Sequence, residues 1–540
     1  MLNVKLNDSI AAGRLFGLDL PHLPAAKAST KLSVTNGSYV FDELQFGLGR
    51  TSVSGRLSFL PGAPRPRVTA NLSGALVDLS ELPFTTTKSG ANNPLLAADV
   101  DADLKFDRVV LEKGRVLNAV NGKLQLTAGA VELKQFGAAV VGASVTADGT
   151  IKDPLTPAGI DLKLNVKMTR GNGLATLTGL QLDSVPPFTA NAKLTDVPGG
   201  FAFADFTLAA AAATITGSGT LIRGPKRYKV SVKANSPMLD AVALIGPATK
   251  STRAVPDIPL PVDALQIVDA DLDLHFDSVK FDEAPPMGAL LISVVIADGQ
   301  LAAKPVQLAI DPGKMLNIGV TADAAKASWT MRVDGAGIDL GKLLTHLGRP
   351  GVVTGGTTDL SLQLDGRGKS MMALLGSLNG DARVSVGPHR IYNFAVNPQT
   401  SIVLRAISPT GAASDTDVTC LAAHVPIRNG VINSVRNVAA ETAKYNAVMA
   451  GQINLASETI DATVVPVVTS GLGLGDVKVV IKLRGHLSSP TVEVNTVDVA
   501  VKSVASIGAA VFTLGGSLVA DALFNKVVSD PTPCATALAQ

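Results

Sequence analysis

Hydrophobic and polar residues alternate along most of this chain, which is the pattern of β-strands that bury one face. In the segment DADLKFD (101–107), Ala102, Leu104 and Phe106 fall on one side, and acidic and basic residues fall on the other. Because successive side chains of a strand point in opposite directions, each segment of this kind has one apolar and one polar face. The alternation therefore predicts a mainly β protein.

The same alternation recurs in DADLDLHFD (269–277) and in TDLSLQLDG (358–366). Separate sandwiches would need large aromatic cores, whereas the chain has few aromatic residues. Strands stacked edge to edge would instead join their apolar sides into one continuous face, either closed by sparse helices or left open as a groove. We assign eight residues as candidates for the wall of this groove: Leu104, Phe106, Leu272, Leu274, Phe276, Leu360, Leu362 and Leu364.

Two of these segments also mark an internal repeat. Ala102 and Ala270 are 168 positions apart (270 − 102), and the turn glycines Gly129 and Gly299 are 170 apart (299 − 129). The repeat predicts an elongated, curved antiparallel β-sheet built from divergent meander repeats, shaped as a groove. We predict β repeat units at 1–86, 95–246 and 262–350, a C-terminal β region at 351–498, and a helix and tail at 499–540.

Helices are expected to be few. Short ones are predicted at 237–245, 338–347 and 370–375, and an amphipathic one at 499–528; proline-rich or irregular linkers are predicted at 246–261 and 85–94. The uncharged run 503–520 is at the lower limit of length for a membrane span. Its bulky residues lie on one side only, which favours a helix on a protein or membrane surface over a spanning helix.

Composition narrows the class of protein. Hydrophobic residues make up 46% of the chain and charged residues 17%, which excludes a disordered chain. The net charge of +2 excludes a nucleic-acid binder, because no basic surplus is present to neutralise phosphates. Two cysteines exclude a disulfide-dense scaffold.

No enzyme activity, cofactor or metal is predicted. Six histidines occur singly, and LDGRGKS (364–370) lacks the first glycine of a phosphate-binding loop. The acidic ladders of 101–107 and 269–277 could in principle bind calcium, but they lack a binding loop and are typical of a solvated surface.

The C-terminal third resembles the AsmA family of envelope proteins. The resemblance rests on segments 355–387 (with SLNG at 377–380), 427–433 (IRNGVIN), 449–466 (MAGQINLASETIDATVVP) and 479–494. The upstream region is similar through its DADL strands and the step G-I-D-L at 337–340, where a short helix follows. The resemblance covers most of the chain and is specific from about 355 to 490.

This resemblance implies a periplasmic protein associated with the inner membrane, with an elongated β-groove related to that of bridge-like lipid-transfer proteins. It also implies phospholipid, and a membrane surface or envelope proteins, as partners. The family usually begins with a membrane helix, whereas residues 1–25 show neither an anchor nor a signal peptide. Either the start lies upstream or the chain is a truncated paralogue.

The resemblance also favours a disulfide between Cys420 and Cys534, because a similar late cysteine follows the family's C-terminal helix. The bond would hold the tail against the sheet. The alternative is that the two cysteines are unrelated.

Three functions remain open at this point. The first is transport of phospholipid acyl chains in the groove for outer-membrane assembly. The second is a structural or regulatory envelope protein that assists outer-membrane protein assembly without lipid transfer. The third, a β-solenoid passenger, is disfavoured because no short rung period occurs.

Overall fold

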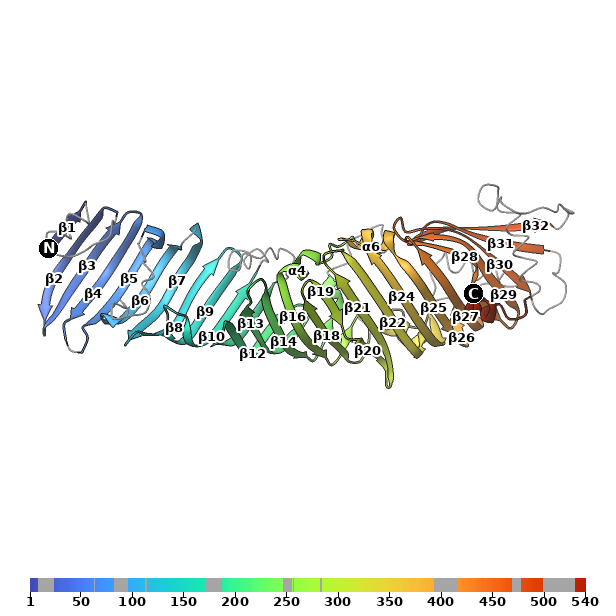
Figure 1. Ribbon diagram of the computed structural model, residues 1–540, viewed down its shortest axis with the longest axis horizontal. Helices are drawn as coiled ribbons and strands as arrows, with labels where there is room; N and C mark the ends of the chain where they lie inside the picture. Colours follow the sequence, from blue (N-terminus) through green and yellow to red (C-terminus); the bar gives the residue numbers. More distant parts are fainter. Residues whose placement is uncertain are drawn as a thin grey trace. The chain divides into compact units, whose positions relative to one another are not determined.

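The computed structural model of the protein describes residues 1–7, 24–62, 64–81, 96–111, 114–169, 187–245, 255, 257–281, 284–392, 415–468, 477–498 and 530–540. They divide into two compact units, Met1–Arg223 and Gly224–Gln540, which we call unit 1 and unit 2. In each unit, strands that follow one another in sequence mostly lie side by side in a β-sheet (Figure 1). The prediction of a mainly β fold with a few short helices is confirmed.

Unit 1 contains one sheet and a short 3-10 helix. Its elements are β1 (Leu2–Leu6), β2 (Ala26–Thr35), β3 (Ser38–Leu48), β4 (Thr51–Leu60), β5 (Arg67–Asp78), η1 (Leu79–Glu81), β6 (Asp99–Val110), β7 (Val116–Thr127), β8 (Ala130–Val140), β9 (Ala143–Asp153), β10 (Ala158–Met168), β11 (Phe188–Val197), β12 (Gly200–Ala210) and β13 (Thr214–Arg223). Tight turns join many neighbours. Asn36 and Gly37, both with positive φ, form the two-residue turn between β2 and β3.

Unit 2 combines a large sheet, a separate two-stranded sheet made by β15 and β17, and five described helices. The strands are β14 (Tyr228–Ser236), β15 (Leu239–Asp240), β16 (Val268–Phe276), β17 (Val279–Lys280), β18 (Leu290–Ala297), β19 (Gln300–Ala303), β20 (Val306–Asp311), β21 (Lys314–Asp323), β22 (Ser328–Asp339), β23 (Val353–Gly355), β24 (Thr357–Arg367), β25 (Asn379–Val386), β26 (His389–Ile391), β27 (Thr416–Arg428), β28 (Val431–Thr442), β29 (Tyr445–Asn454), β30 (Thr459–Val468), β31 (Val477–His486) and β32 (Ser489–Asp498). The helices are α3 (Ala241–Ile245), α4 (Val262–Ile267), α5 (Leu340–His346), α6 (Met371–Ser377) and α9 (Pro533–Ala539).

The pairing is mixed rather than antiparallel throughout, which refines the expectation from the sequence. β5 pairs with β6 in parallel, and β14 pairs with β16 in parallel. In each pair, the second strand carries the sequence DADL. The register places Ala70 beside Ala102 and Val230 beside Ala270. Alternation of side chains carries no information about strand direction, so the crossover connections that parallel pairs need were not predicted.

Three predicted helices, α3, α5 and α6, are confirmed, whereas α4 and α9 were not predicted. Aspartates that end a strand cap the helical turn that follows it. The Asp339 carboxylate accepts the N–H of Lys342 at 2.9 Å, and the Asp240 carboxylate accepts the N–H of Ala243 at 2.8 Å. This explains the repeated step of a hydrophobic residue and aspartate at strand ends.

Several predicted segments lie outside the described residues. They are the helix at 499–528, the run 503–520, the linker at 85–94 and most of the linker at 246–261. Among the helices that the structure does describe, none has both the length and the apolar character required to cross a bilayer. The finer division of the chain into five segments stays a prediction.

Candidate functional site

One row of apolar residues crosses unit 1 from β2 to β13 without a break. Directly opposite residues of neighbouring strands point to the same side of a sheet, so the row can be followed through the strand register. Its members are Leu32, Phe41, Leu57, Ala70, Ala102, Leu124, Leu133, Gly149, Leu162, Leu194, Phe203 and Gly219. We call the side of the sheet that bears this row the apolar face of unit 1.

The predicted residues Leu104 and Phe106 lie on this face, beside the row. Leu104 is opposite Leu72 on β5 and Gly122 on β7. Both predicted side chains are only half-buried, and Leu32 of the row is 45% exposed. Within the described part of unit 1, no second sheet and no helix other than η1 is present to cover the face.

Two glycines, Gly149 in the row and Gly55 beside it, show why this face contains residues without a side chain. Gly55 and Gly149 have φ values of +149° and +132°, and a Cβ at either position would lie 1.9 Å and 2.1 Å from a backbone oxygen of the next strand. Both lie beside positions where the strand pairing shifts by a residue. Glycine is therefore required at these bends of the sheet.

A second unbroken row crosses unit 2. Its members, from β16 to β32, are Phe276, Leu290, Leu308, Leu316, Gly335, Leu360, Val384, Ala423, Val438, Met449, Val464, Ile481 and Val494. We call this side the apolar face of unit 2. It contains the predicted residues Phe276 and Leu360, and Leu362 lies beside them opposite Val333 and Ala382.

Helices cover both margins of the apolar face of unit 2. Val262 and Leu265 of α4 pack with Ala322, and with Trp329 near the start of β22. At the other end of the same strand, Leu343 of α5 packs with Leu308 and Leu316, in a cluster that also holds Ala241 of α3. Leu374 and Leu375 of α6 pack on Leu364.

The structure accordingly divides the eight predicted residues. Phe276 and Leu364 are buried, at 5% and 9% exposure. The other six, which include Leu272 and Leu274 in the middle of β16, are half-buried. The equally apolar β18, β20 and β21 were not predicted to line the groove, although β20 and β21 alternate and β18 is an almost continuous apolar run.

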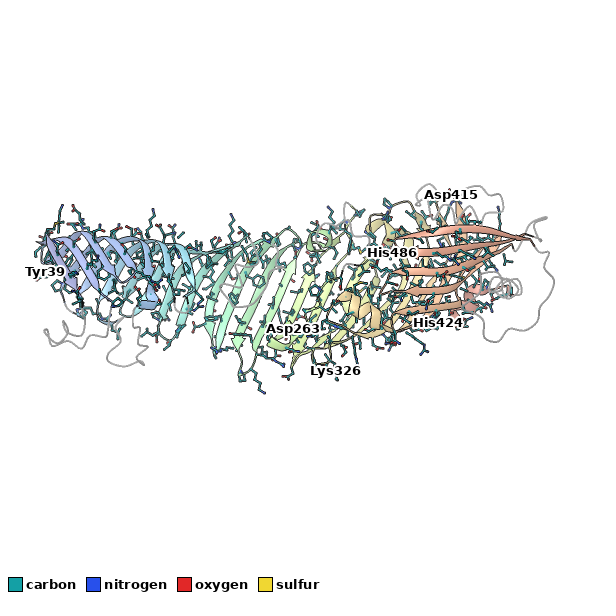
Figure 2. All side chains as sticks on the ribbon, turned by 90° about the horizontal axis from the view of Figure 1, so that it is seen from above. Tyr39, Asp263, Lys326, Asp415, His424 and His486 are labelled. Atoms are coloured by element: carbon teal, nitrogen blue, oxygen red, sulfur yellow. A yellow bond between two sulfur atoms is a disulfide. The ribbon has the colours of Figure 1, made fainter. Side chains whose placement is uncertain are left out.

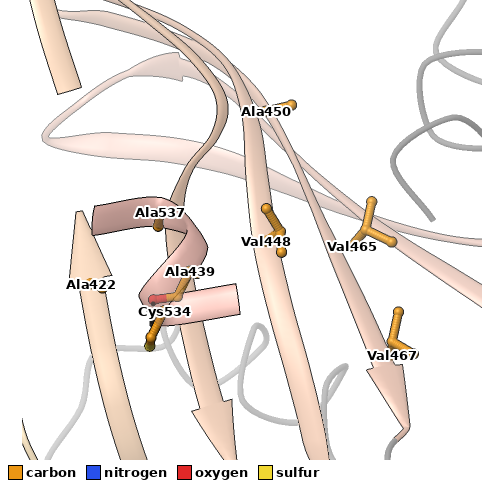
Figure 3. Close-up of a cluster of buried hydrophobic side chains, with 8 residues drawn as sticks. All are labelled: Ala422, Ala439, Val448, Ala450, Val465, Val467, Cys534 and Ala537. Carbon is orange, nitrogen blue, oxygen red and sulfur yellow. Dashed lines mark hydrogen bonds between the residues drawn. The ribbon is translucent and has the colours of Figure 1, made fainter. Parts of the chain in front are cut away.

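The C-terminal strands of unit 2 have a second apolar side, on which α9 packs (Figure 3). There Ala422, Ala439, Val448 and Val465 lie opposite one another on β27 to β30. All four are buried to within 2% exposure. Ala537 of α9 is buried in the same cluster.

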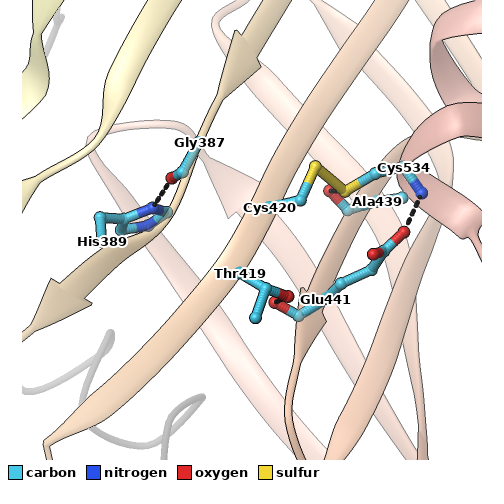
Figure 4. The surroundings of a disulfide bond; sticks show 7 residues. All are labelled: Gly387, His389, Thr419, Cys420, Ala439, Glu441 and Cys534. Atoms are coloured by element: carbon cyan, nitrogen blue, oxygen red, sulfur yellow. Dashed lines mark hydrogen bonds between the residues drawn. A yellow bond between two sulfur atoms is a disulfide. The ribbon is translucent and has the colours of Figure 1, made fainter.

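A disulfide joins α9 to β27 (Figure 4). It links Cys534 to Cys420, whose Cα atoms are 6.5 Å apart. The N–H of Cys534 also donates to a carboxylate oxygen of Glu441 at 2.7 Å, and Arg436 forms an ion pair with Asp530 just before the helix. These contacts together fix the helix on β27 and β28.

Groups with catalytic or metal-binding chemistry are dispersed in the described residues, which contain no cluster of three histidine, cysteine or acidic side chains. His424 on β27 pairs with Asp381, and His486 lies at the end of β31 (Figure 2). Ser370 of LDGRGKS caps α6 through Ala373. The acidic ladder of β16 faces β14, where Lys229 is opposite Asp269.

Comparison with known proteins finds similarity to one family. Residues 248–436 match the model of the AsmA family. The chain is also 23% identical, over 428 residues, to AsmA family protein YhjG of Escherichia coli (strain K12). The chain is similar to the AsmA family over these residues. The alignment covers 73% of this chain and 62% of that AsmA protein, so the chain spans less than two thirds of its length.

Proposed function

We propose that this chain, which is similar to the AsmA family, is a cell-envelope protein that binds phospholipid by its acyl chains along the apolar faces and carries it for outer-membrane assembly. The observation that carries the proposal is the unbroken apolar row of unit 1, most of whose residues are half-buried or exposed, whereas Ala70, Ala102 and Leu162 are buried. A contiguous apolar surface of this extent is unfavourable in water and is typical of an interaction site.

The chemistry of the row suits an acyl chain. Its described members are aliphatic residues, phenylalanine and glycine, and none offers a charge or a hydrogen bond from its side chain. Each methylene group moved from water onto such a surface gains about 0.8 kcal/mol. Polar residues alternate onto the other side, so headgroups would stay in water with little selection among them. We place this activity in the periplasm, next to the inner membrane.

The test is lipid uptake by the purified chain from vesicles that contain a fluorescent phospholipid. Leu104→Asp places a carboxylate on the apolar face, and its matched control Ser73→Asp places one on the polar side of the neighbouring strand, where Ser73 is exposed opposite Lys105. We expect Leu104→Asp to weaken uptake about tenfold, which is a loss of 1.4 kcal/mol. Ser73→Asp should leave uptake unchanged.

A wild-type chain that is monodisperse, copurifies with no lipid and takes up none would overturn the proposal. The second candidate, a structural envelope protein without lipid transfer, is favoured by the helix-covered margins of unit 2. It predicts that Leu104→Asp and Ser73→Asp behave alike in uptake, and that the wild-type chain still binds envelope proteins.

A further inference from the structure

Unit 2 contains a hollow of about 610 Å³, whose lining includes the predicted groove residue Leu274 together with several polar residues. It is lined by β14, β16 and β18, together with the end of the connection between β19 and β20. The lining residues are Lys233, Ala234, Asn235, Asp273, Leu274, His275, Leu291, Ile292, Ser293, Lys304, Pro305 and Gln307. We call it the β14–β20 hollow.

The register places its polar residues in two adjacent rows. In the first row, Lys233 is opposite Asp273, which is opposite Ser293, and the N–H of Lys304 donates to the carbonyl of Ser293 at 3.0 Å. In the second row the order is Asn235, His275, Leu291 and Gln307. These eight side chains therefore project from the same side of four neighbouring segments.

The hollow has a local cause. β19 ends at Ala303 and β20 begins at Val306, so the strand that flanks β18 is interrupted at Pro305. Proline has no N–H to donate to the ladder, and an extra residue in one strand bends it locally. The small side chain of Ser293 leaves the space beside this bend unfilled.

The charges of the hollow are unpaired within the part of the chain that the structure describes. Lys233, Lys304 and Asp273 make no ion pair with a described residue. The Nε2 atom of His275 lies 3.6 Å from Oδ1 of Asp277. Other exposed lysines do pair, such as Lys342 with Asp311 at 3.1 Å. Leu291 at the floor is 37% exposed.

Two ammonium groups that approach one hollow, with an imidazole in the adjacent row, favour an anion with several acceptor oxygens. The single carboxylate of Asp273 adds a preference for a ligand that also carries a hydroxyl or an ammonium donor. A phosphate ester of a small polyol or amino alcohol has both features. We propose that the β14–β20 hollow binds the phosphate group of such an ester.

The same chemistry occurs in a soluble ester and in a phospholipid headgroup at a membrane surface, so the experiment has two arms. In the first, glycerol 3-phosphate is titrated into the full chain by calorimetry. In the second, the chain is floated with vesicles of phosphatidylethanolamine and phosphatidylglycerol. Both arms compare the wild type with Lys233→Gln/Lys304→Gln and with the control Lys229→Gln, an exposed lysine of β14 outside the hollow.

We expect the double variant to bind about tenfold more weakly, or 1.4 kcal/mol, and Lys229→Gln to bind normally. An effect with glycerol 3-phosphate identifies a soluble ester, and an effect with vesicles alone identifies a headgroup. Ser293→Phe should abolish the binding while it keeps every charge, because it fills the hollow.

Absence of binding in both arms, or an equal loss in Lys229→Gln, would overturn the proposal. All of these variants leave the apolar faces unaltered, so acyl-chain uptake should be the same in each. The proposal for the hollow can therefore fail while the proposed function stands, and the reverse also holds.

Discussion

The two units present the same alternating strands with different degrees of cover. In the described part of unit 1, the apolar face has no helix on it, and Leu104 and Phe106 are half-buried. In unit 2, α4 covers one margin of the apolar face, and α3 and α5 cover the other. The difference arises from the connections, because several strands of unit 2 are followed by a helix where many strands of unit 1 are followed by a tight turn.

This comparison indicates that the strands supply the apolar face. The helices that follow some of the strands decide how much of that face is accessible. The apolar rows of the two units have similar compositions, and Leu308, Leu316 and Leu360 are typical members of the row in unit 2. A helix after the strand converts part of it into a packed core, with the burial energy that a core provides. Four predictions test this contrast.

The largest expected effect is that of the disulfide, which only unit 2 contains. Cys420→Ser/Cys534→Ser should lower the free energy of unfolding of unit 2 by about 4 to 5 kcal/mol, because the bond closes a long loop in the unfolded chain. The separation of the two cysteines is 114 residues. Hydrogen exchange resolved by peptide should show the loss on β27 and β28, and none in unit 1.

A reductant should reproduce this loss in the wild type and have no effect in the double variant. Labelling of two free thiols in denatured, unreduced wild-type protein would contradict the bond.

The second prediction compares one substitution in the two units. Leu364→Ala removes a side chain that is 9% exposed and packed by α6, and should cost about 3 kcal/mol. Leu104→Ala removes a half-buried side chain and should cost only about 1 kcal/mol. Urea unfolding of each variant measures both values. Equal costs would mean that the apolar face of unit 1 is covered as fully as that of unit 2.

The third prediction concerns the capping of α5. Asp339→Ala removes the acceptor of the Lys342 N–H and should cost about 1 kcal/mol of unit 2 stability. Asp339→Asn keeps an acceptor oxygen and should restore most of the loss. If the alanine and asparagine variants unfold at the same urea concentration, the Asp339 cap does not hold α5 at the margin of the apolar face of unit 2.

The smallest effect is a pH dependence of unit 1. The hydrogen bond from Ser80 Oγ, aided by the Arg50 guanidinium, holds the pKa of the buried Asp78 carboxyl below its usual value of 3.8. The ionised carboxylate therefore stabilises the folded state above about pH 4, and this contribution is lost as the pH falls through the folded-state pKa.

Asp78→Asn should reduce the stability of unit 1 at neutral pH and flatten its decline below pH 4. Urea midpoints measured across this range test the prediction. Asp103→Asn, on the exposed side of β6, serves as the control and should keep the wild-type decline. A wild-type decline in Asp78→Asn would assign the acid sensitivity to another group.

Much of the architecture could be predicted from the chain. The alternation in 101–107 and 358–366 correctly predicted β6 and β24, and the hydrophobic residue and aspartate before 340–346 correctly predicted α5. The parallel pairs could not be predicted. Polar residues such as Asp101 and Asp103 alternate with apolar ones in the same way whether the neighbouring strand is parallel or antiparallel. The grouping of Lys233 with Lys304 was also invisible, since it depends on the register of β14, β16 and β18.

The sequence by itself determined the local properties: which segments are strands, which side of each strand is apolar, and where the turns bend. These follow from the two-residue period of side chains and from the φ values that residues such as Gly55 allow. Only the tertiary structure decided that the apolar sides join into unbroken rows, that helices cover them in unit 2 alone among the described residues, and that α9 packs on a second apolar side of β27 to β30. The reason is that register, strand direction and helix placement depend on contacts between segments far apart in the chain, which a local pattern does not encode.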